Sequence, residues 1–185
     1  TIDIGGEKTL PQLKIEAEPN PALGLRASRF SLQNRELFRV QIRAILRASV
    51  RKNVRVIIPM ITEMEEIGEI RVLFREAREE LSAQGLGFDP SVPLGIMIEV
   101  PAAAAIADLL AREVDFFSIG TNDLLQYFLA VDRSNEYVSY LYKPLHPAAW
   151  RLLKHVIVSA DRLGKDVALC GEMAADPLAA VVLLG

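Results

Sequence analysis

The sequence predicts an α/β fold built around a parallel β-sheet. Segments of strand length alternate with longer amphipathic segments of helical period, as in chains that repeat a strand–helix unit. The strand-length segments are apolar throughout rather than at every second residue, which is typical of strands buried on both faces of a parallel sheet. Two of these apolar runs stop at a carboxylate, the first at Glu99 and the second at Asp123.

The beginning of the chain is expected to hold a strand, a loop and a helix. Thr1–Ile4 is predicted to be a short strand followed by a Gly-Gly turn, and residues 7–30 a Pro-rich irregular loop that includes Pro11. Asn34 is predicted to cap a helix over about residues 35–50. The apolar side of this helix holds Leu37, Phe38, Ile42, Ile45 and Leu46, and an arginine recurs every four residues on the other side. In an acidic chain such an arginine row indicates a solvated face.

The rest of the chain is expected to alternate strands and helices in regular order. Val54–Pro59, Leu94–Glu99, Val114–Ile119 and Val167–Cys170 are the predicted strands. The predicted helices are an amphipathic one from a capping box at Thr62 and Glu65 to near Gly85, an alanine-rich one from Pro101 to about Arg112, a short one over Asn122–Leu129, an amphipathic one over Pro147–Leu163 and a last one from Pro177.

Composition narrows the class of protein. The chain has 185 residues, of which 51% are hydrophobic and 24% charged, as in an ordinary globular domain with a core. A net charge of −3 gives no support to a nucleic-acid or anionic-membrane role. One cysteine excludes a disulfide framework and agrees with a reducing cytoplasm. No signal peptide is visible, and no apolar run reaches membrane-spanning length.

The strand ends predict a site for a metal ion and a phosphate. Parallel strands deliver their carboxyl ends to one edge, so Glu99 and Asp123 are expected to lie near each other, with Arg133 ten residues further on. Carboxylates with a cation suit Mg²⁺ holding an anionic, phosphate-bearing substrate. Each carboxylate could instead bond a neighbouring backbone N–H group or an arginine. Asn122 lies at a helix start, where it is either a phosphate contact or an ordinary cap.

Several motifs also resemble a known family. They are Glu99-Val-Pro-Ala-Ala, Gly120-Thr-Asn-Asp-Leu, Ala130-Val-Asp-Arg-Ser-Asn135, Cys170-Gly-Glu, Thr1-Ile-Asp-Ile-Gly-Gly6 and Asn20-Pro-Ala-Leu-Gly-Leu-Arg26. Together they resemble the phosphoenolpyruvate-binding barrel of the enzyme I family of the sugar phosphotransferase system. The Gly-Thr-Asn-Asp block is shared with pyruvate phosphate dikinase and phosphoenolpyruvate synthase, and the Ala-Val-Asp-Arg-Ser-Asn block points more to enzyme I.

The resemblance implies a (β/α)₈ TIM barrel of the phosphoenolpyruvate/pyruvate type. The chain, residues 1–185, would be one incomplete barrel domain covering about the third to seventh strands, cut from a longer protein. With strands missing, we expect this piece to have no phosphotransferase activity alone, to bind phosphoenolpyruvate weakly and to self-associate through its open sheet edges.

The resemblance also implies a role for each candidate residue. Mg²⁺, or Mn²⁺, would be held by Glu99 and Asp123. The phosphoenolpyruvate would be bound by Arg26, Asn122, Asp123 and Arg133. Cys170 would be the general acid that protonates C3 of enolpyruvate to give pyruvate, since a thiol is mostly protonated at neutral pH. Glu172 is either a structural partner or a site residue. His146 and His155 do not resemble the family's phosphorylated histidine, and no catalytic role is expected for them.

Partners and alternatives follow from the same resemblance. The phosphoryl group would pass to a histidine on a separate amino-terminal domain and then to a phosphocarrier protein, and the parent would be a cytoplasmic homodimer. The sugar and nitrogen-regulatory pathways are not separated. Two other classes stay open: a dikinase, a synthase or a pyruvate-enolate lyase on the same barrel, and an inactive fragment that acts only as an interaction module. A phosphoryl-transfer assay against a carrier protein distinguishes enzyme I from the other enzymes on this barrel. Loss of Mg²⁺-dependent ligand binding would support the inactive fragment.

Overall fold

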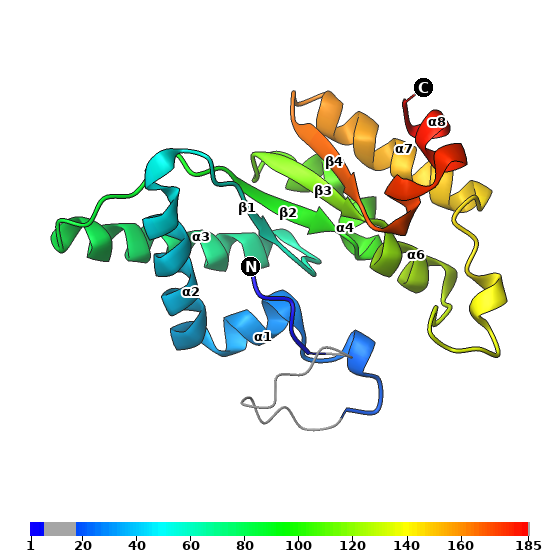
Figure 1. Ribbon diagram of the computed structural model, residues 1–185, viewed down its shortest axis with the longest axis horizontal. Helices are drawn as coiled ribbons and strands as arrows, with labels where there is room; N and C mark the ends of the chain where they lie inside the picture. Colours follow the sequence, from blue (N-terminus) through cyan, green and yellow to red (C-terminus); the bar gives the residue numbers. More distant parts are fainter. Residues whose placement is uncertain (6–17, 185) are drawn as a thin grey trace. The chain divides into compact units, whose positions relative to one another are not determined.

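Helices and strands alternate along the chain in the computed structural model, which describes residues 1–5 and 18–184 (Figure 1). The chain divides into two compact units. Thr1–Met60 and Glu65–Leu94 form the first unit, and Ile61–Met64 and Gly95–Gly185 form the second. The expected turn residue Gly6 and the loop residue Pro11 lie outside the described residues.

The first unit is mostly helical. Its elements are the 3-10 helix η1 (Pro21–Leu23), α1 (Ala27–Gln33), α2 (Arg35–Ala48), the 3-10 helix η2 (Ser49–Arg51), the strand β1 (Val56–Ile58) and α3 (Met64–Ala83). In α2 the buried residues Phe38, Ile42 and Leu46 recur every four residues, so one apolar stripe faces the core. The predicted helix over 35–50 is therefore confirmed, with its last residues in the tighter turn η2.

Three predictions for this unit are wrong. Thr1–Ile4 is not a strand: the amino group of Thr1 donates to the backbone oxygen of Ile57 in β1 at 2.7 Å, but Ile2 N donates to a side chain, Gln41 Oε1, at 3.1 Å. The predicted loop over 7–30 ends in helix α1. The side chain of Asn34 does not cap α2, because its amide donates to Phe30 O at 2.9 Å at the end of α1.

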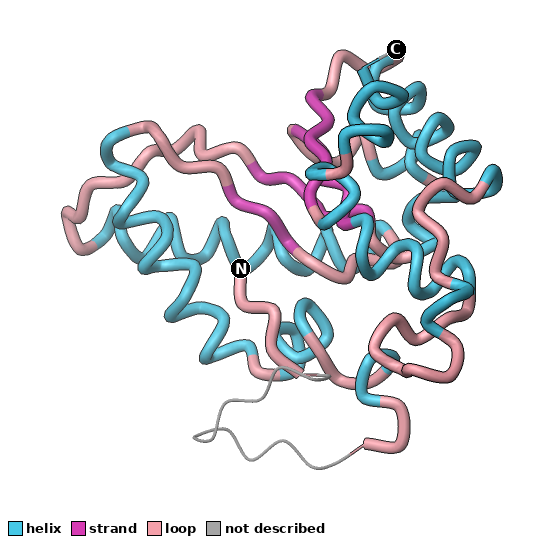
Figure 2. Tube along the Cα trace, turned by 45° about the vertical axis from the view of Figure 1, so that its right-hand side comes forward, coloured by secondary structure: helices cyan, strands magenta, loops and turns pink. Residues whose placement is uncertain are grey.

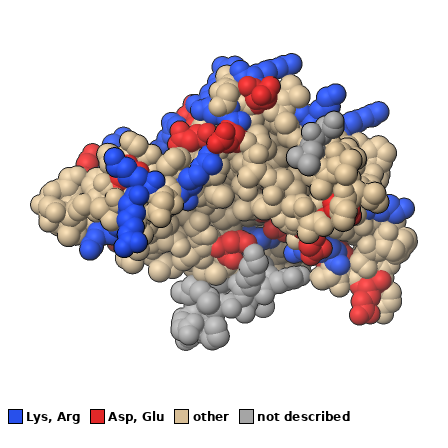
Figure 3. Space-filling view, turned by 45° about the horizontal axis from the view of Figure 1, so that its top comes forward, with Lys and Arg blue, Asp and Glu red and all other residues tan. Residues whose placement is uncertain are grey.

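The arginine row of α2 is an ion-paired surface rather than a simply solvated one. Arg35 pairs with Glu69 of α3, and Arg39 and Arg43 both pair with Glu80. On the face drawn in Figure 3, acidic side chains likewise lie beside basic ones in several places. Such pairs tie two helices together but contribute little stability each, because water still reaches them.

The second unit is built on a parallel sheet, as predicted. Its elements are β2 (Leu94–Ile98), α4 (Pro101–Ala105), α5 (Ala107–Leu110), β3 (Phe116–Gly120), α6 (Thr121–Leu129), the 3-10 helix η3 (Ser139–Leu141), α7 (Pro147–Asp161), β4 (Asp166–Cys170), the 3-10 helix η4 (Glu172–Ala175) and α8 (Pro177–Leu184). β3 pairs in parallel with β2 on one side and with β4 on the other. The alanine-rich helix is interrupted at Ile106, whose backbone angles lie outside the helical region.

Helices cover one face of this sheet. α7 packs against β4, and α4 and α5 pack against α7. Figure 2 shows helices lying beside the strands. Ile96, Ile98, Phe117 and Ile119 are each at most 1% exposed and alternate along β2 and β3 with residues of the opposite face. Among the described residues, no helix is both long and apolar enough to cross a membrane.

Candidate functional site

The carboxyl ends of β2, β3 and β4 bring Glu99, Gly120 and Cys170 into one row. Ile98 lies opposite Ile119, so the next residues, Glu99 and Gly120, come level, and Gly120 lies directly opposite Cys170. Glu99 is only 3% exposed. A buried carboxylate and a thiol are therefore placed on either side of a glycine at one edge of the sheet.

Gly120 makes room for the carboxylate of Glu99. A Cβ atom at this position would come within 3.0 Å of Glu99 Oε2 and within 2.9 Å of Met97 Sδ. A side chain at this position would force Glu99 or Met97 to shift. The glycine in the Gly-Thr-Asn-Asp motif is thus required by the approach of its neighbour on β2.

The start of α6 is fastened to the loop that follows β4. Thr121 Oγ1 donates to Cys170 O at 2.9 Å, and Asn122 Oδ1 accepts from the backbone N–H of Glu172 at 3.0 Å. Gly171 permits this approach with a φ of +101°, because a Cβ atom there would lie 2.4 Å from Thr121 Oγ1. Since the amide oxygen of Asn122 is engaged, a contact between this side chain and an anion would use its amide nitrogen.

Asp123 lies in the first turn of α6, where the helix presents backbone N–H groups and a partial positive charge. Arg133 reaches the same region from the loop after α6. Its Nη1 atom is 3.7 Å from Glu172 Oε1, and the two side chains are 39% and 82% exposed. The loop is held by a bond from Arg133 N to Gln126 Oε1 at 3.1 Å.

Tyr142 is a residue of this region that the sequence did not single out. Its hydroxyl donates to the backbone oxygen of Asn122 at 3.4 Å. Burial raises the pKa of Tyr142, Arg133 opposes that rise, and the carboxylates of Glu172 and Asp123 add to it. The pKa of this hydroxyl therefore depends on Asp123, Arg133 and Glu172 together. No spacing rule marks Tyr142, because it is one of several tyrosines in a loop without periodicity.

Cys170 has two hydrogen-bond partners on β3. Its Sγ atom donates to Ile119 O at 3.3 Å and accepts from Ser118 Oγ at 3.4 Å. The Cys170 residue is partly exposed. The candidate residues Glu99, Asn122, Asp123, Arg133 and Cys170 thus all belong to the carboxyl edge of one sheet.

Arg26 belongs to the first unit and has a very different setting. It is 6% exposed, and its Nη2 atom lies 3.2 Å and 3.4 Å from the two carboxylate oxygens of Asp3. The next residue, Ala27, has a φ of +52°, which is rare for a residue with a side chain. Backbone strain of this kind is retained where the surroundings hold the chain firmly.

The two acidic residues at the sheet edge are of a type that suits a magnesium ion. Within the described part of the chain, no group of three or more His, Cys, Asp or Glu side chains could hold a metal. Mg²⁺ does not need such a group, because it takes one or two protein carboxylates and completes its octahedron with water and substrate oxygens. Glu99, in the space that Gly120 leaves, and Asp123, at the start of α6, are carboxylates of this kind.

The histidines have structural roles. His146 Nδ1 accepts from Ala148 N at 3.1 Å and so caps α7, and His155 Nε2 lies 3.3 Å from Ala105 O. Neither contact involves one of the candidate residues at the carboxyl edge of the sheet.

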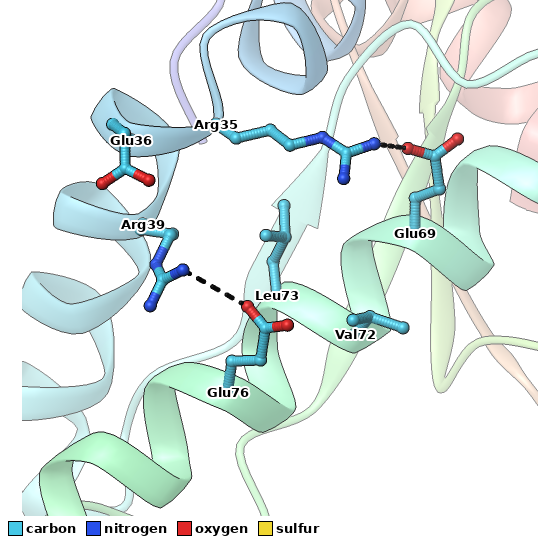
Figure 4. A pocket seen from close by; sticks show the side chains of 7 residues that line it. All are labelled: Arg35, Glu36, Arg39, Glu69, Val72, Leu73 and Glu76. Carbon is cyan, nitrogen blue, oxygen red and sulfur yellow. Dashed lines mark hydrogen bonds and ion pairs between the residues drawn. The ribbon is translucent and has the colours of Figure 1, made fainter.

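A groove in the first unit offers a different kind of surface. It has a volume of about 340 Å³ and lies between α2 and α3, lined by Arg35, Glu36, Arg39, Glu69, Val72, Leu73 and Glu76 (Figure 4). Its cations point to acidic partners: Arg35 pairs with Glu69, and Arg39 Nη1 is 3.5 Å from Glu76 Oε2. Charges already paired within the protein make this groove a weak candidate for an anionic ligand.

Comparison with known proteins identifies the family. The model of the PEP-binding domain of PEP-utilising enzymes matches residues 1–185. Relatives named phosphoenolpyruvate-protein phosphotransferase include one from Bacillus sp. (strain S), 51% identical over 184 residues, and one from Listeria monocytogenes, 52% identical over 185 residues. A third, from Bacillus subtilis, is 50% identical. Each match covers the whole of this chain and 32% of the relative, so the chain spans about a third of their length.

A solved structure supports the same fold. The crystal structure of a citrate lyase from Burkholderia xenovorans LB400 matches 71% of this chain and 40% of its own, with a TM-score of 0.55 and 22% identity. At that identity the likeness concerns the fold alone. Together with the full-length match to the family model, the motifs at the strand ends lead to one conclusion: the chain belongs to the PEP-utilising enzymes, as their PEP-binding domain.

Proposed function

We propose that the carboxyl edge of β2, β3 and β4 binds phosphoenolpyruvate and is the phosphoryl-donor site of a longer phosphoenolpyruvate-dependent protein phosphotransferase. The observation that carries the proposal is the row of Glu99, Gly120 and Cys170 beside the start of α6. A metal-ligating acid, a helix amino end and a proton donor are the groups that cleavage of an enol phosphate needs, and they meet at one edge.

Glu99 and Asp123 would hold Mg²⁺, or Mn²⁺ in its place. When bound, such an ion neutralises negative charge on the phosphate and on the enolate oxygen. Arg133, Asn122 and the N–H groups of the first turn of α6 bind and orient the phosphate. Arg26 is proposed as a further phosphate contact. Phosphoryl transfer depends mainly on positioning and charge neutralisation, and these cationic and N–H donors supply both.

The acceptor would be a histidine on another domain of the parent protein, which then passes the phosphoryl group to a phosphocarrier protein. Enolpyruvate remains at the site, and Cys170 protonates its C3 carbon to give pyruvate. We extend the proposal to a parent that is a cytoplasmic homodimer. A single cysteine in 185 residues is in keeping with a reducing compartment.

The test is Asp123→Ala in the full-length protein. Phosphoryl transfer from phosphoenolpyruvate should fall by about a hundredfold or more, because a charged ligand at the reacting group is lost. Asp108→Ala is the matched control, since Asp108 also lies in the first turn of a helix of the second unit and is exposed. Equal melting temperatures show that both variants fold. Near-normal turnover in Asp123→Ala would overturn the assignment.

A further inference from the structure

Ser118 is a polar residue in the middle of a fully buried strand. All five residues of β3 are buried, and Ser118 is 4% exposed between Phe117 and Ile119. A buried hydroxyl is costly unless it makes a hydrogen bond. Here the hydroxyl donates to Cys170 Sγ on the neighbouring strand, with 3.4 Å between the oxygen and the sulfur. The serine is therefore explained by the thiol.

The thiol is held from two sides. Ser118 donates to the sulfur, and the sulfur donates its own hydrogen to Ile119 O at 3.3 Å. Ser118 lies opposite Ala168, two residues before Cys170 on β4, so the contact runs diagonally between the strands. In this arrangement the sulfur donates its own hydrogen and also receives a hydrogen bond, which would support negative charge on it.

We propose that Ser118 is a positioning residue for Cys170, which fixes the thiol at the sheet edge and stabilises its sulfur while the proton leaves. This inference rests on the proposed function. In the step concerned, the S–H bond of Cys170 breaks, the electron pair of the C2–C3 double bond of the enolate left after phosphoryl transfer forms the new C3–H bond, and a lone pair of the enolate oxygen forms the C2=O bond of pyruvate. The sulfur keeps the S–H electron pair as a thiolate and is reprotonated by water. The O–H bond of Ser118 stays intact.

The hydrogen bond from Ser118 to the sulfur should accelerate only the proton-transfer step. A hydrogen bond to an ionised acceptor is roughly twice as strong as one to a neutral acceptor. The bond from Ser118 therefore strengthens as the sulfur gains charge, and only an interaction that strengthens in the transition state accelerates the reaction. Transfer of the phosphoryl group does not change the charge of the sulfur, so Ser118 should not affect that half-reaction.

The experiment separates the two half-reactions in the full-length protein. Ser118→Ala is compared with Ser159→Ala, a control that also removes a hydroxyl that is 4% exposed in the second unit, but from α7. Phosphoryl transfer to the histidine is followed separately from exchange of the pyruvate methyl protons with D₂O, which reports protonation at C3. We expect Ser118→Ala to slow exchange by about tenfold and to leave phosphoryl transfer unchanged. Ser159→Ala should change neither rate.

A second readout does not depend on activity. The infrared S–H stretch of Cys170, identified as the band lost in Cys170→Ala, should shift in Ser118→Ala and stay in place in Ser159→Ala. If Ser118→Ala does not fold, Ser118→Cys keeps the size of the side chain with a weaker donor and should slow exchange by a smaller factor. Exchange and band position in a folded Ser118 variant that match the Ser159→Ala control would overturn the inference.

Cys170→Ala distinguishes failure of the inference from failure of the proposed function. If this variant exchanges pyruvate protons normally, Cys170 is not the acid and the proposed protonation step fails. If it stops exchange while Ser118→Ala does not slow it, the proposed function stands and only the role of Ser118 is lost.

Discussion

Arg26 and Arg133 carry the same predicted role in two regions of opposite character. Arg26, in the first unit, is 6% exposed and lies 3.2 Å from Asp3. Arg133, in the second unit, has a side chain that is 39% exposed, and its carboxylate neighbour Glu172, at 3.7 Å, is 82% exposed. One guanidinium is fixed inside the protein, whereas the other lies at the surface of a loop.

Because of this difference in burial, Arg26 is a preorganised cation and Arg133 is an adjustable one. A buried arginine depends on its partner, because removing either member of the pair leaves an uncompensated charge. It also loses little freedom when a ligand binds, since its side chain is already ordered. An exposed pair contributes little to stability and is readily exchanged for a stronger bidentate contact with phosphate.

The packing around Arg26 explains how it is held. Gly5 lies so close that a Cβ atom there would come within 2.7 Å of Arg26 Cα and 2.8 Å of its Cβ. On the other side, the strained residue Ala27 donates its backbone N–H to Ile4 O at 2.8 Å. The start of the chain and the segment before α1 therefore lock together around the arginine.

The largest expected effect is that of Arg26→Met on stability. Arg26→Met removes the guanidinium beside Asp3, a carboxylate that is only 25% exposed and is therefore mostly buried. We expect the free energy of unfolding to fall by about 2–3 kcal/mol, somewhat less than for a fully buried pair. Urea denaturation measures this. Arg47→Met, at an exposed position of α2, is the control and should be nearly neutral. Equal stability of Arg26→Met and Arg47→Met would contradict the view that Arg26 is a fixed, structurally required arginine.

Arg133→Ala should have the opposite profile. Stability should stay almost unchanged, because the pair with Glu172 is exposed. Affinity for phosphoenolpyruvate in the presence of Mg²⁺ should fall by about tenfold or more, since a charged hydrogen bond to phosphate is lost. Calorimetry on the full-length protein measures this, with Arg151→Ala on the exposed side of α7 as the control. Unchanged affinity would remove Arg133 from the phosphate site.

The smallest effect concerns the arginines of α2. The hydrogen bonds from Arg43 and then Arg39 hold the pKa of Glu80 below its ordinary value of 4.5. Because folding lowers the pKa of Glu80, its ionised carboxylate stabilises the protein fully at pH values above 4.5. This stabilisation is lost as the pH falls from 4.5 toward the lowered pKa. In Glu80→Gln the loss of stability over this acid range should be slightly smaller than in the parent, as measured by melting temperature against pH. Glu79→Gln, exposed on the same helix, should keep the parent's profile.

The strand ends were predictable because their signals are local. An apolar run that stops at a polar residue marks both the strand and its end, so Glu99 and the start of α6 lie where the sequence indicated. The cap at Asn34 was mispredicted by equally local reasoning. The side chain of Asn34 could bond the backbone of the helix before it or of the helix after it. It donates to Phe30 O at the end of α1.

The alternation of strands and helices, the parallel sheet, the acidic strand ends and the family could be predicted from the residues alone. Which polar groups meet depends on tertiary packing: Arg26 bonds Asp3, Tyr142 bonds Asn122 and Ser118 bonds Cys170, partners that are 23, 20 and 52 residues apart. The physical reason is that strand and helix formation follow from the period of neighbouring residues, whereas a hydrogen bond between distant residues depends on register and on the small residues that allow close approach. Gly5 allows the close approach of Arg26, Gly120 that of Glu99 and Gly171 that of Thr121, and no periodic pattern in the sequence predicts these contacts.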